Sequence, residues 1–366
     1  MIMYKEEEII LFNMMKKTWL LYGAYGYTGS LIAQRAKDRG HNLVLAGRSA
    51  EMLTSLGKKL DLDYRVFDLK NDEKILKEIK EFDLVLHAAG PFKYTSAPMI
   101  KACLKSKTNY LDITGEIPVM EQNFTYDMQA KENDFVIISG VGFDVVPTDC
   151  LAKYVSDKIT NPTSLEIGIS SMSNLSPGTI KTMFEYNEMG RLVRKNGKLV
   201  PLEKEYERKV QFIDKELTVR PVTWGDLSTA YRSTGIPNIT IYFPIPKKSL
   251  NILKLAGVSA KEMSTNEKAK KKVENWIEEH IHGPDETARK TNRCQIWVSV
   301  SNDDGRCEQA WLETMESYRF TVEAAVLSVE KVLEQQPKGA LTPALAFGAD
   351  FILEVPETYR YDSLLL

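Results

Sequence analysis

Length, composition and charge exclude several classes of protein. The chain has 366 residues, of which 43% are hydrophobic and 27% are charged, a balance typical of soluble globular proteins. A chain of this length is too long to fold around one ordinary hydrophobic core, so we expect two domains. Lys and Arg together number 48 and Asp and Glu number 50, which leaves a formal net charge of −2. No overall field therefore attracts nucleic acid or an anionic membrane.

Residues 1–17 are expected to form a loose N-terminal extension. This stretch lacks the basic residues and the small-residue cleavage site of a signal peptide. No apolar run in the sequence approaches the roughly 18 residues that are needed to span a bilayer. We therefore expect no transmembrane segment and a cytoplasmic location.

The four cysteines are expected to be free thiols, which suits a reducing cytoplasm. They are Cys103, Cys150, Cys294 and Cys307, and no C-x-x-C spacing occurs among them. A turn around residues 302–305 predicts a hairpin in which Cys307 pairs with a residue near Val300 or Asn302. Cys294 then lies several residues away along the ladder, too far for a disulfide.

Strands and helices alternate from Thr18 to about Cys150, which predicts a doubly wound parallel α/β sheet of the Rossmann type. The apolar segments expected to form its strands are 19–22, 42–46, 64–67, 83–87, 110–113 and 135–139. The patterns expected to form helices are 30–39, 72–81, 97–105 and 119–131. Residues 18–150 are therefore assigned to a first domain.

The second half of the chain is less regular and predicts a mixed α+β domain over residues 151–338. Residues 164–171 alternate as a half-buried strand should, and so do residues 296–300. Residues 322–333 carry the apolar spacing of an amphipathic helix. Residues 187–220 are polar and charged, and we expect a loop or a lid there. Residues 339–366 are expected to pack back on the first domain.

A glycine-rich turn, Gly23-Ala24-Tyr25-Gly26-Tyr27-Thr28-Gly29, follows the first strand and precedes a helix. Glycines at this place let the backbone approach a nucleotide diphosphate, while the helix N-terminus offers free N–H groups and partial positive charge. The spacing G-x-x-G-x-x-G is weak evidence by itself, but its place between strand and helix predicts a dinucleotide site. Its members assigned to cofactor binding are Gly23, Tyr25, Gly26, Tyr27, Thr28 and Gly29.

The second strand ends at Arg48-Ser49, where folds that bind NAD carry an acid for the ribose 2′-hydroxyl. A guanidinium beside a hydroxyl suits a 2′-phosphate, so these two residues favour NADP. The alternative is that Arg48 is an ordinary cation at a strand end. Asp68, at the end of the third strand, has two open interpretations: it accepts from the adenine amino group, or it caps the helix that begins near Asp72.

The fourth strand ends in small residues that leave room for the ribose and nicotinamide of a dinucleotide. Those assigned to the cofactor are Ala88, Ala89, Gly90 and Pro91. His87, just before them, is either a general acid or, as is more common inside an apolar strand, a packed and hydrogen-bonded side chain.

Several motifs in one order resemble the saccharopine dehydrogenase-like oxidoreductases, a family that includes the trans-acting enoyl reductases. The segments that carry the resemblance are 23–29, 46–49, 89–92, 110–116 and 142–149, with looser matches at 176–179, 339–344 and 347–348. The resemblance implies an NADP-binding Rossmann domain and a second domain that shapes the substrate pocket. Saccharopine enzymes reduce an imine formed with an amino acid, whereas the enoyl reductases, the closer match, reduce a carbon–carbon double bond in an acyl chain.

Catalytic candidates lie at the carboxyl ends of the strands, where the cofactor is expected to bind. Asp144 has two open interpretations: it acts on the substrate, by orienting it or by relaying a proton, or it has only a structural role. Phe143 beside it is placed to stack near a nicotinamide. Asp149 and Thr148 are interpreted as the start of the next helix, with Thr148 as its cap. Tyr110 is a second proton donor candidate, although a tyrosine in a strand is more often part of the core.

Two further patterns have ordinary explanations. Tyr154 and Lys158 have the Tyr-x-x-x-Lys spacing of short-chain dehydrogenases, which places both residues on one helix face, but the spacing arises easily by chance. His280 and His282, with Asp285 and Glu286, are expected to lie in a solvated turn. We predict no structural metal.

The sequence thus predicts an NADP-dependent reductase that transfers hydride to an enoyl, acyl or imine-type small-molecule substrate. Two alternatives stay open: a sensor that binds NADP(H), and an accessory protein that presents residues 239–243 and 250–255 to a partner. For these segments, the core of the second domain or a homodimer interface is expected before a docking surface.

Overall fold

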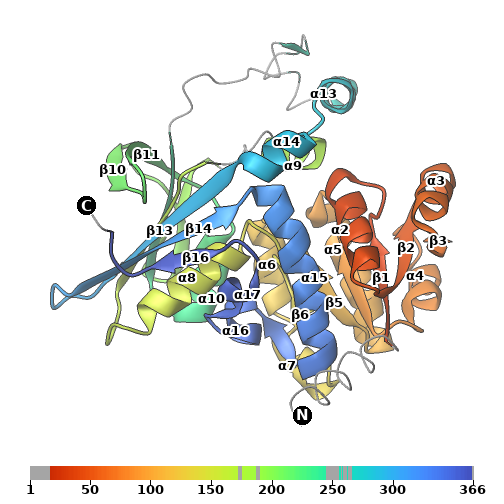
Figure 1. The fold of residues 1–366 in the computed structure, drawn as a ribbon, viewed down its shortest axis with the longest axis horizontal. Helices are drawn as coiled ribbons and strands as arrows, with labels where there is room; N and C mark the ends of the chain where they lie inside the picture. Colours follow the sequence, from red (N-terminus) through yellow and green to blue (C-terminus); the bar gives the residue numbers. More distant parts are fainter. Residues whose placement is uncertain are drawn as a thin grey trace.

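The computed structural model describes residues 17–171, 175–186, 190–244, 255–256, 258, 262 and 266–364. The predicted N-terminal extension and residues 250–254 lie outside this set, apart from Lys17. Two sheets with their covering helices organise the described chain, and helices α8 (Val146–Ser156) and α15 (Ser317–Gln335) lie between them (Figure 1).

The first sheet has seven strands in the order β15-β6-β5-β4-β1-β2-β3, and every pair is parallel. Its strands are β1 (Thr18–Tyr22), β2 (Asn42–Gly47), β3 (Tyr64–Val66), β4 (Leu84–His87), β5 (Asn109–Asp112), β6 (Val136–Ile138) and β15 (Gly339–Leu341). The predicted Rossmann-type sheet is confirmed. The C-terminal strand β15 adds to its edge beside β6.

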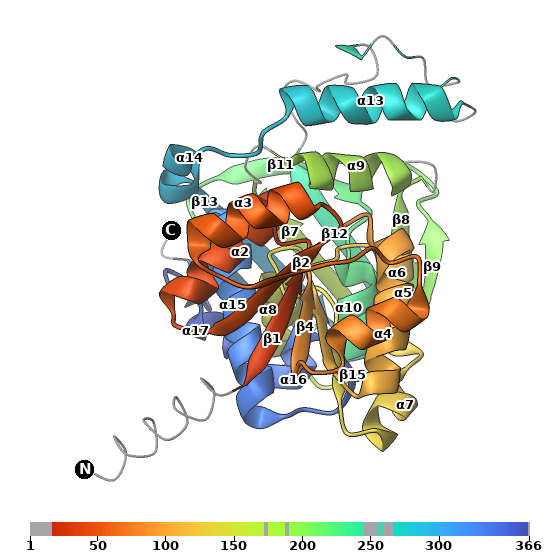
Figure 2. The ribbon, with the colours of Figure 1, turned by 90° about the vertical axis from the view of Figure 1, so that its right-hand side faces the viewer.

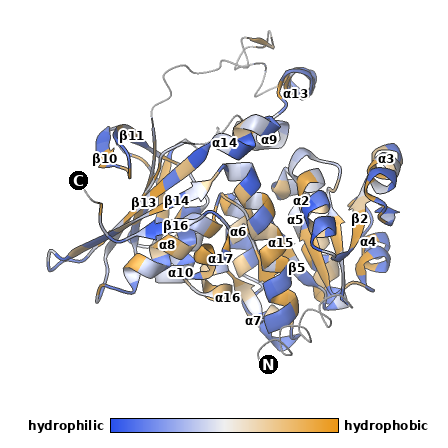
Figure 3. Cartoon of the chain, in the orientation of Figure 1, coloured by the Kyte–Doolittle hydropathy of each residue, from blue (hydrophilic) through white to orange (hydrophobic). Residues whose placement is uncertain are grey.

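Helices cover both faces of the first sheet (Figure 2). One face packs against α2 (Tyr27–Asp38), α3 (Ala50–Leu60) and α15, and the other against α4 (Asp72–Ile79) and α5 (Phe92–Ser106). The central strands β1, β2 and β4 are mostly apolar because both of their faces are buried, as their orange colour in Figure 3 shows, whereas the edge strand β3 is more exposed. Two short helices, α6 (Ile117–Phe124) and α7 (Asp127–Glu132), replace the single helix expected over residues 119–131.

The second sheet is mixed and has nine strands, seven of them in the order β10-β11-β12-β7-β13-β14-β16. Its strands are β7 (Ser164–Ile169), β8 (Leu192–Lys195), β9 (Lys198–Pro201), β10 (Arg208–Gln211), β11 (Glu216–Val222), β12 (Asn238–Pro244), β13 (Arg293–Ser301), β14 (Cys307–Met315) and β16 (Tyr359–Tyr361). The helices that pack on its inner face are α8, α10 (Asp226–Thr234) and α17 (Phe351–Glu354).

The expectation of a loop over residues 187–220 is wrong for its described part, which contains β8, β9, β10 and most of β11. These strands expose one face to solvent, and charged side chains pair across them. Lys209 contacts Glu216 at 2.9 Å, and Arg220 contacts Glu207 at 2.7 Å. The charges that suggested a loop therefore belong to the solvated face of a sheet.

The second sheet also contains the predicted hairpin at Cys307 and the apolar segment 239–243. Ser301 stands opposite Cys307 in the β13–β14 hairpin, and all four cysteines are free, so the hairpin prediction is confirmed. The proposed docking segment 239–243 is strand β12 inside the sheet, where Ile239 and Ile241 belong to the buried core. That segment is therefore core and not a docking surface. No helix in the described part of the chain is long and apolar enough to cross a membrane.

Candidate functional site

The glycine turn is built so tightly that side chains are excluded at two of its positions. Gly23 has a φ of 87°, which favours glycine, and its N–H donates to the carbonyl of Ala46 at 2.9 Å. A Cβ on Gly29 would lie 2.2 Å from the carbonyl oxygen of Gly23. The turn thus brings the start of α2 directly against the end of β1.

The first turn of α2 presents free backbone donors. No side chain caps this helix at Gly26. No described residue accepts a hydrogen bond from the amides of Tyr27, Thr28 or Gly29. Such unpaired N–H groups at a helix N-terminus form an anion-binding site.

Arg48 lies exposed just beyond the end of β2, next to this turn. Within the described ranges, its guanidinium forms no ion pair or side-chain hydrogen bond. The ring of Tyr25 lies over Gly47, where a Cβ would come within 2.6 Å of it. The neighbouring Ser49 is the N-cap of α3, because its Oγ accepts from the N–H of Met52.

Asp68 does not cap a helix. The N-cap of α4 is Asn71, whose side chain accepts from the N–H of Lys74 at 2.9 Å. Asp68 is exposed, and its Oδ1 accepts from the N–H of Lys70 at 3.2 Å, which closes a local turn. The capping interpretation is therefore wrong, and an adenine contact stays a prediction.

The loop after β4 lies against the glycine turn. A Cβ on Gly23 would come within 2.8 Å of Ala88 and Ala89, so these small residues and the turn share one narrow space. The peptide bond between Gly90 and Pro91 is cis. The hydroxyl of Thr95 donates to the carbonyl of Ala89 at 2.7 Å and holds the loop onto α5.

His87 and Tyr110 form a buried pair beneath this edge. The imidazole Nδ1 lies 3.2 Å from the Tyr110 hydroxyl, which also donates to Ser96. Burial lowers the pKa of His87 to about 3 and raises the pKa of Tyr110 well above its ordinary value. Both side chains are therefore neutral near pH 7, and both are enclosed by the protein.

Asp112 organises the loops at the ends of β5 and β6. Its carboxylate accepts from the N–H groups of Thr114 and Gly140 at 3.1 and 3.0 Å, and from the hydroxyl of Ser139. Burial raises its pKa to about 6, although these donors favour the charged form. Asp112 therefore fixes the backbone that follows β5 and β6, at the carboxyl ends of the parallel strands.

Asp144 lines a small cavity of about 70 Å³ at the same edge. The carboxyl approaches Gly115 so closely that a Cβ there would lie 2.7 Å from Oδ2. No described residue hydrogen-bonds to this carboxyl, and burial raises its pKa to about 6. Asp144 therefore lines a cavity, whereas His87 and Tyr110 are enclosed by the protein.

The cavity also receives side chains from the second half of the chain, which the sequence analysis missed. Residues that line it are Thr28, Ile113, Gly142, Phe143, Thr179, Ser317, Tyr318 and Thr321. The Tyr318 hydroxyl accepts from the N–H of Ser176 at 2.7 Å and lies 3.0 Å from Oγ1 of Thr179. Its ring meets that of Tyr27 edge-on at 5.1 Å. The loose motif at 176–179 is the only sequence signal for this contact.

A second contact joins the glycine turn to the second half of the chain. The hydroxyl of Tyr27 donates to the carbonyl of Pro284 at 2.5 Å, and Nη1 of Arg289 lies 2.9 Å from the same hydroxyl. The start of α2 is therefore covered by residues from α14 (Glu286–Thr291) and the chain before it.

Thr148 and Asp149 lie at the start of α8, as interpreted, but Thr148 does not cap this helix. The Thr148 hydroxyl donates to the carbonyl of Val145, and no side chain caps α8. Asp149 is fully buried, and its Oδ2 accepts from the N–H of Ala344 at 2.9 Å. Burial raises its pKa to about 6 and raises that of the neighbouring Asp226 well above its ordinary range.

Tyr154 and Lys158 serve the packing of the C-terminal segment. Both contact the carboxylate of Asp362, at 3.0 and 2.7 Å. The guanidinium carbon of Arg360 lies 3.4 Å from the centre of the Tyr154 ring. These contacts occur at the end of α8 that is remote from Asp144. No group of three or more potential metal ligands occurs in the described ranges.

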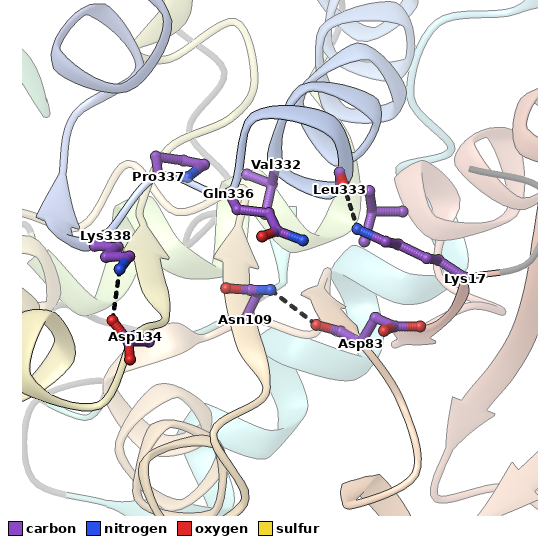
Figure 4. A pocket seen from close by; sticks show the side chains of 9 residues that line it. All are labelled: Lys17, Asp83, Asn109, Asp134, Val332, Leu333, Gln336, Pro337 and Lys338. Atoms are coloured by element: carbon purple, nitrogen blue, oxygen red, sulfur yellow. Dashed lines mark hydrogen bonds and ion pairs between the residues drawn. The ribbon is translucent and has the colours of Figure 1, made fainter. Parts of the chain in front are cut away.

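A larger pocket, of about 400 Å³, lies at the opposite end of the first sheet (Figure 4). Most of its polar groups are already paired: Lys17 with Leu333, Asn109 with Asp83, and Lys338 with Asp134. Asp83 and Asn109 stand where β4 and β5 begin, whereas ligands of parallel α/β sheets bind where strands end. We therefore place the functional site at the smaller cavity.

Comparisons with known proteins match the part of the chain that forms the first sheet. The family model of the saccharopine dehydrogenase NADP binding domain matches residues 19–138. Over this region, the chain is similar to the NADP-binding domain of saccharopine dehydrogenases. The resemblance drawn from the motifs is confirmed, and NADP is the cofactor of this domain family.

The named relatives match this chain over only part of its length. The trans-acting enoyl reductase of Mycobacterium ulcerans is 31% identical over 138 residues, which cover 36% of this chain and 33% of the relative. The saccharopine dehydrogenase-like oxidoreductase of Rattus norvegicus is 28% identical over 160 residues, 38% of this chain and 37% of the relative. The chain thus matches about a third of the length of these curated relatives.

The fold similarity extends further than the sequence similarity. Saccharopine dehydrogenase (L-Glu forming) from Saccharomyces cerevisiae aligns with a TM-score of 0.61 at 11% identity, covering 94% of this chain and 100% of that chain. This likeness shows that the two proteins share a fold. The second, mixed sheet therefore belongs to the shared fold together with the NADP-binding domain.

The candidate site around the glycine turn fits NADP on geometric grounds as well. The glycine turn leaves no room for Cβ atoms at Gly23 and Gly29, and the first amides of α2 are free for a diphosphate. Arg48 stands next to this turn as a cation that no described carboxylate neutralises. Free helix amides are of the kind that bind a diphosphate, and an unpaired guanidinium is of the kind that binds a 2′-phosphate.

Proposed function

We propose that this protein is an NADP-dependent oxidoreductase that reduces an enoyl, acyl or imine-type substrate. One observation carries the proposal: the NADP-binding edge adjoins a cavity lined by Asp144, a carboxyl group with a pKa of about 6 that makes no hydrogen bond to a described residue. An ionisable group poised near neutral pH suits proton transfer.

Each residue group has a distinct part in this proposal. Gly23–Gly29 and the loop Ala88–Pro91 hold the dinucleotide, while Arg48 holds its 2′-phosphate. Bound NADPH supplies a hydride to one atom of the double bond. Asp144 supplies the proton that the other atom takes up, and Thr179 and Tyr318 line the space in which the substrate is held.

His87 and Tyr110 have no direct part in proton transfer in this proposal. Their burial keeps both neutral, and their hydrogen bond to one another holds the ends of β4 and β5 in register beneath the cofactor edge. Residues 18–150 act as the cofactor unit and residues 151–338 as the unit for substrate binding or dimerisation. The free thiols suit a cytoplasmic location.

The test is oxidation of NADPH in the presence of three substrate classes: an enoyl thioester, an enone, and a mixture of a 2-oxo acid with an amino acid. Consumption of NADPH with one class, with the reduced product identified by mass, supports the proposal. Tight NADPH binding without oxidation by any class contradicts it and favours the sensor or accessory alternative.

A further inference from the structure

Arg289 is a cation from the second half of the chain that rests on the glycine turn. Its Nη1 lies 2.9 Å from the hydroxyl of Tyr27 and 2.7 Å from the carbonyl oxygen of Pro284. Tyr27 is the first residue of α2, and Gly283 lies so near its ring that a Cβ would come within 2.9 Å. Residues 283–289 are thus laid across the start of the helix.

The partners of Arg289 are all neutral within the described chain. Neighbouring cations are neutralised, since Lys290 contacts Glu286 at 2.6 Å and Arg293 contacts Glu357 at 2.7 Å. Arg289 hydrogen-bonds only to a hydroxyl and a carbonyl in the described chain, while Glu286, which pairs with Lys290, interacts with its charge through space. A guanidinium has five N–H donors in a planar fork, so it retains donors for a further acceptor.

The charge therefore contacts the side chain of the first residue of α2, a helix whose first amides are free. The amides of Tyr27, Thr28 and Gly29 have no described acceptor, and the positive end of the helix dipole lies there. Two positive elements from distant parts of the chain, the Arg289 guanidinium and the start of α2, thus meet at Tyr27. A diphosphate is the group of the dinucleotide that this combination suits.

We propose that Arg289 binds the diphosphate of NADP and thereby closes the second half of the chain over the cofactor. The inference rests on the proposed function for the identity of the cofactor. The guanidinium exchanges the neutral oxygens of Tyr27 and Pro284 for phosphate oxygens, and the contact between residues 283–289 and α2 tightens when the cofactor binds.

The test is fluorescence titration of the full chain with NADPH and NADH, for the wild type, Arg289→Gln and Lys290→Gln. Both dinucleotides carry the diphosphate, so Arg289→Gln weakens both by the same factor, about tenfold or more, the scale of a charged hydrogen bond. Lys290→Gln removes one positive charge from the adjacent position and leaves both affinities within about twofold of the wild type.

A competition titration with 2′-AMP identifies the part of the cofactor that Arg289 contacts. This probe has the 2′-phosphate but no diphosphate, so its affinity stays the same in Arg289→Gln, which also shows that the variant is folded. The affinity of Arg289→Gln for NADPH also depends less steeply on salt than that of the wild type.

Three results are decisive against the inference. Equal NADPH affinity in the wild type and Arg289→Gln overturns it and leaves the proposed function intact. An equal loss of 2′-AMP binding places Arg289 elsewhere on the cofactor and also overturns it. A wild type that binds neither dinucleotide overturns the inference together with the proposed function.

Discussion

The carboxylate of Glu116 accepts a hydrogen bond from the backbone N–H of Phe92 at 2.7 Å. Its second oxygen accepts from the N–H of Lys93 at 2.8 Å. The loop after β5 therefore satisfies two of the unpaired donors at the start of α5, which no side chain of the helix itself caps. This buried contact fixes the loop that leads from the cofactor edge into α5.

Replacing Glu116 with Gln is expected to destabilise the protein by about 1.5–3 kcal/mol, the scale of a hydrogen bond to a charged group. Glutamine has one carbonyl acceptor, so its amide group faces the N–H of Phe92 or Lys93. Chemical denaturation measures the loss. Glu132→Gln, at an exposed position on α7, is the control and changes stability little; similar values for the two variants rule out the capping role of Glu116.

Asp149 makes stability depend on pH in a predictable direction. Burial raises its pKa to about 6 in the folded chain, against about 3.9 for an ordinary aspartate. The folded state therefore binds more protons than the unfolded state between these values, so this group's contribution to stability falls as pH rises from about 4 to 6. The full change is on the order of 2–3 kcal/mol.

Asp149→Asn removes this dependence and keeps an acceptor for the N–H of Ala344. The melting temperature of the variant, relative to the wild type, is expected to be higher at pH 7 than at pH 4.5. Asp157→Asn, at an exposed site on the end of the same helix, is the control. A relative melting temperature for Asp149→Asn that is the same at both pH values contradicts the assignment.

Tyr154→Phe is expected to leave NADPH binding and turnover within about twofold of the wild type. The hydroxyl contacts Asp362 in the C-terminal segment, so its loss affects stability by about 1 kcal/mol or less. Steady-state kinetics and thermal unfolding measure the two effects. A drop in turnover of a hundredfold instead indicates the Tyr-x-x-x-Lys chemistry of short-chain dehydrogenases.

Asp144→Asn is expected to reduce turnover about a hundredfold or more, the scale of a lost general acid, while NADPH affinity is retained. In the wild type, kcat/KM for reduction falls as pH rises through about 6, because the carboxyl then loses its proton. The variant lacks this limb of the pH profile. An unchanged profile in Asp144→Asn shows that another group donates the proton.

Local features of the sequence correctly predicted the first six strands of the first sheet and the tight glycine turn after β1. The glycine turn can be recognised in the sequence because Gly23 and Gly29 meet short-range constraints of the backbone, as the 2.2 Å approach at Gly29 illustrates. The start of α5 was placed too late, at Ala97 instead of Phe92. Its first donors are satisfied by Glu116, which lies beyond the helix in the sequence and gives no local signal.

Features that depend on distant pairing were not predictable. Strand β15 has only three residues, and its partner β6 lies far away in the chain. Tyr318 and Arg289 reach the cofactor edge through tertiary packing, without a motif of their own. Residues 208–220 were misread because the sheet exposes one face there, where Lys209 and Glu216 pair in solvent.

The most direct test of the account is the affinity of the wild type and Arg48→Ala for NADPH and for NADH. The account predicts that the wild type prefers NADPH, and that Arg48→Ala loses about 1.5–3 kcal/mol of NADPH affinity with little change for NADH. Equal losses for both dinucleotides, or a wild type that binds neither, would contradict it.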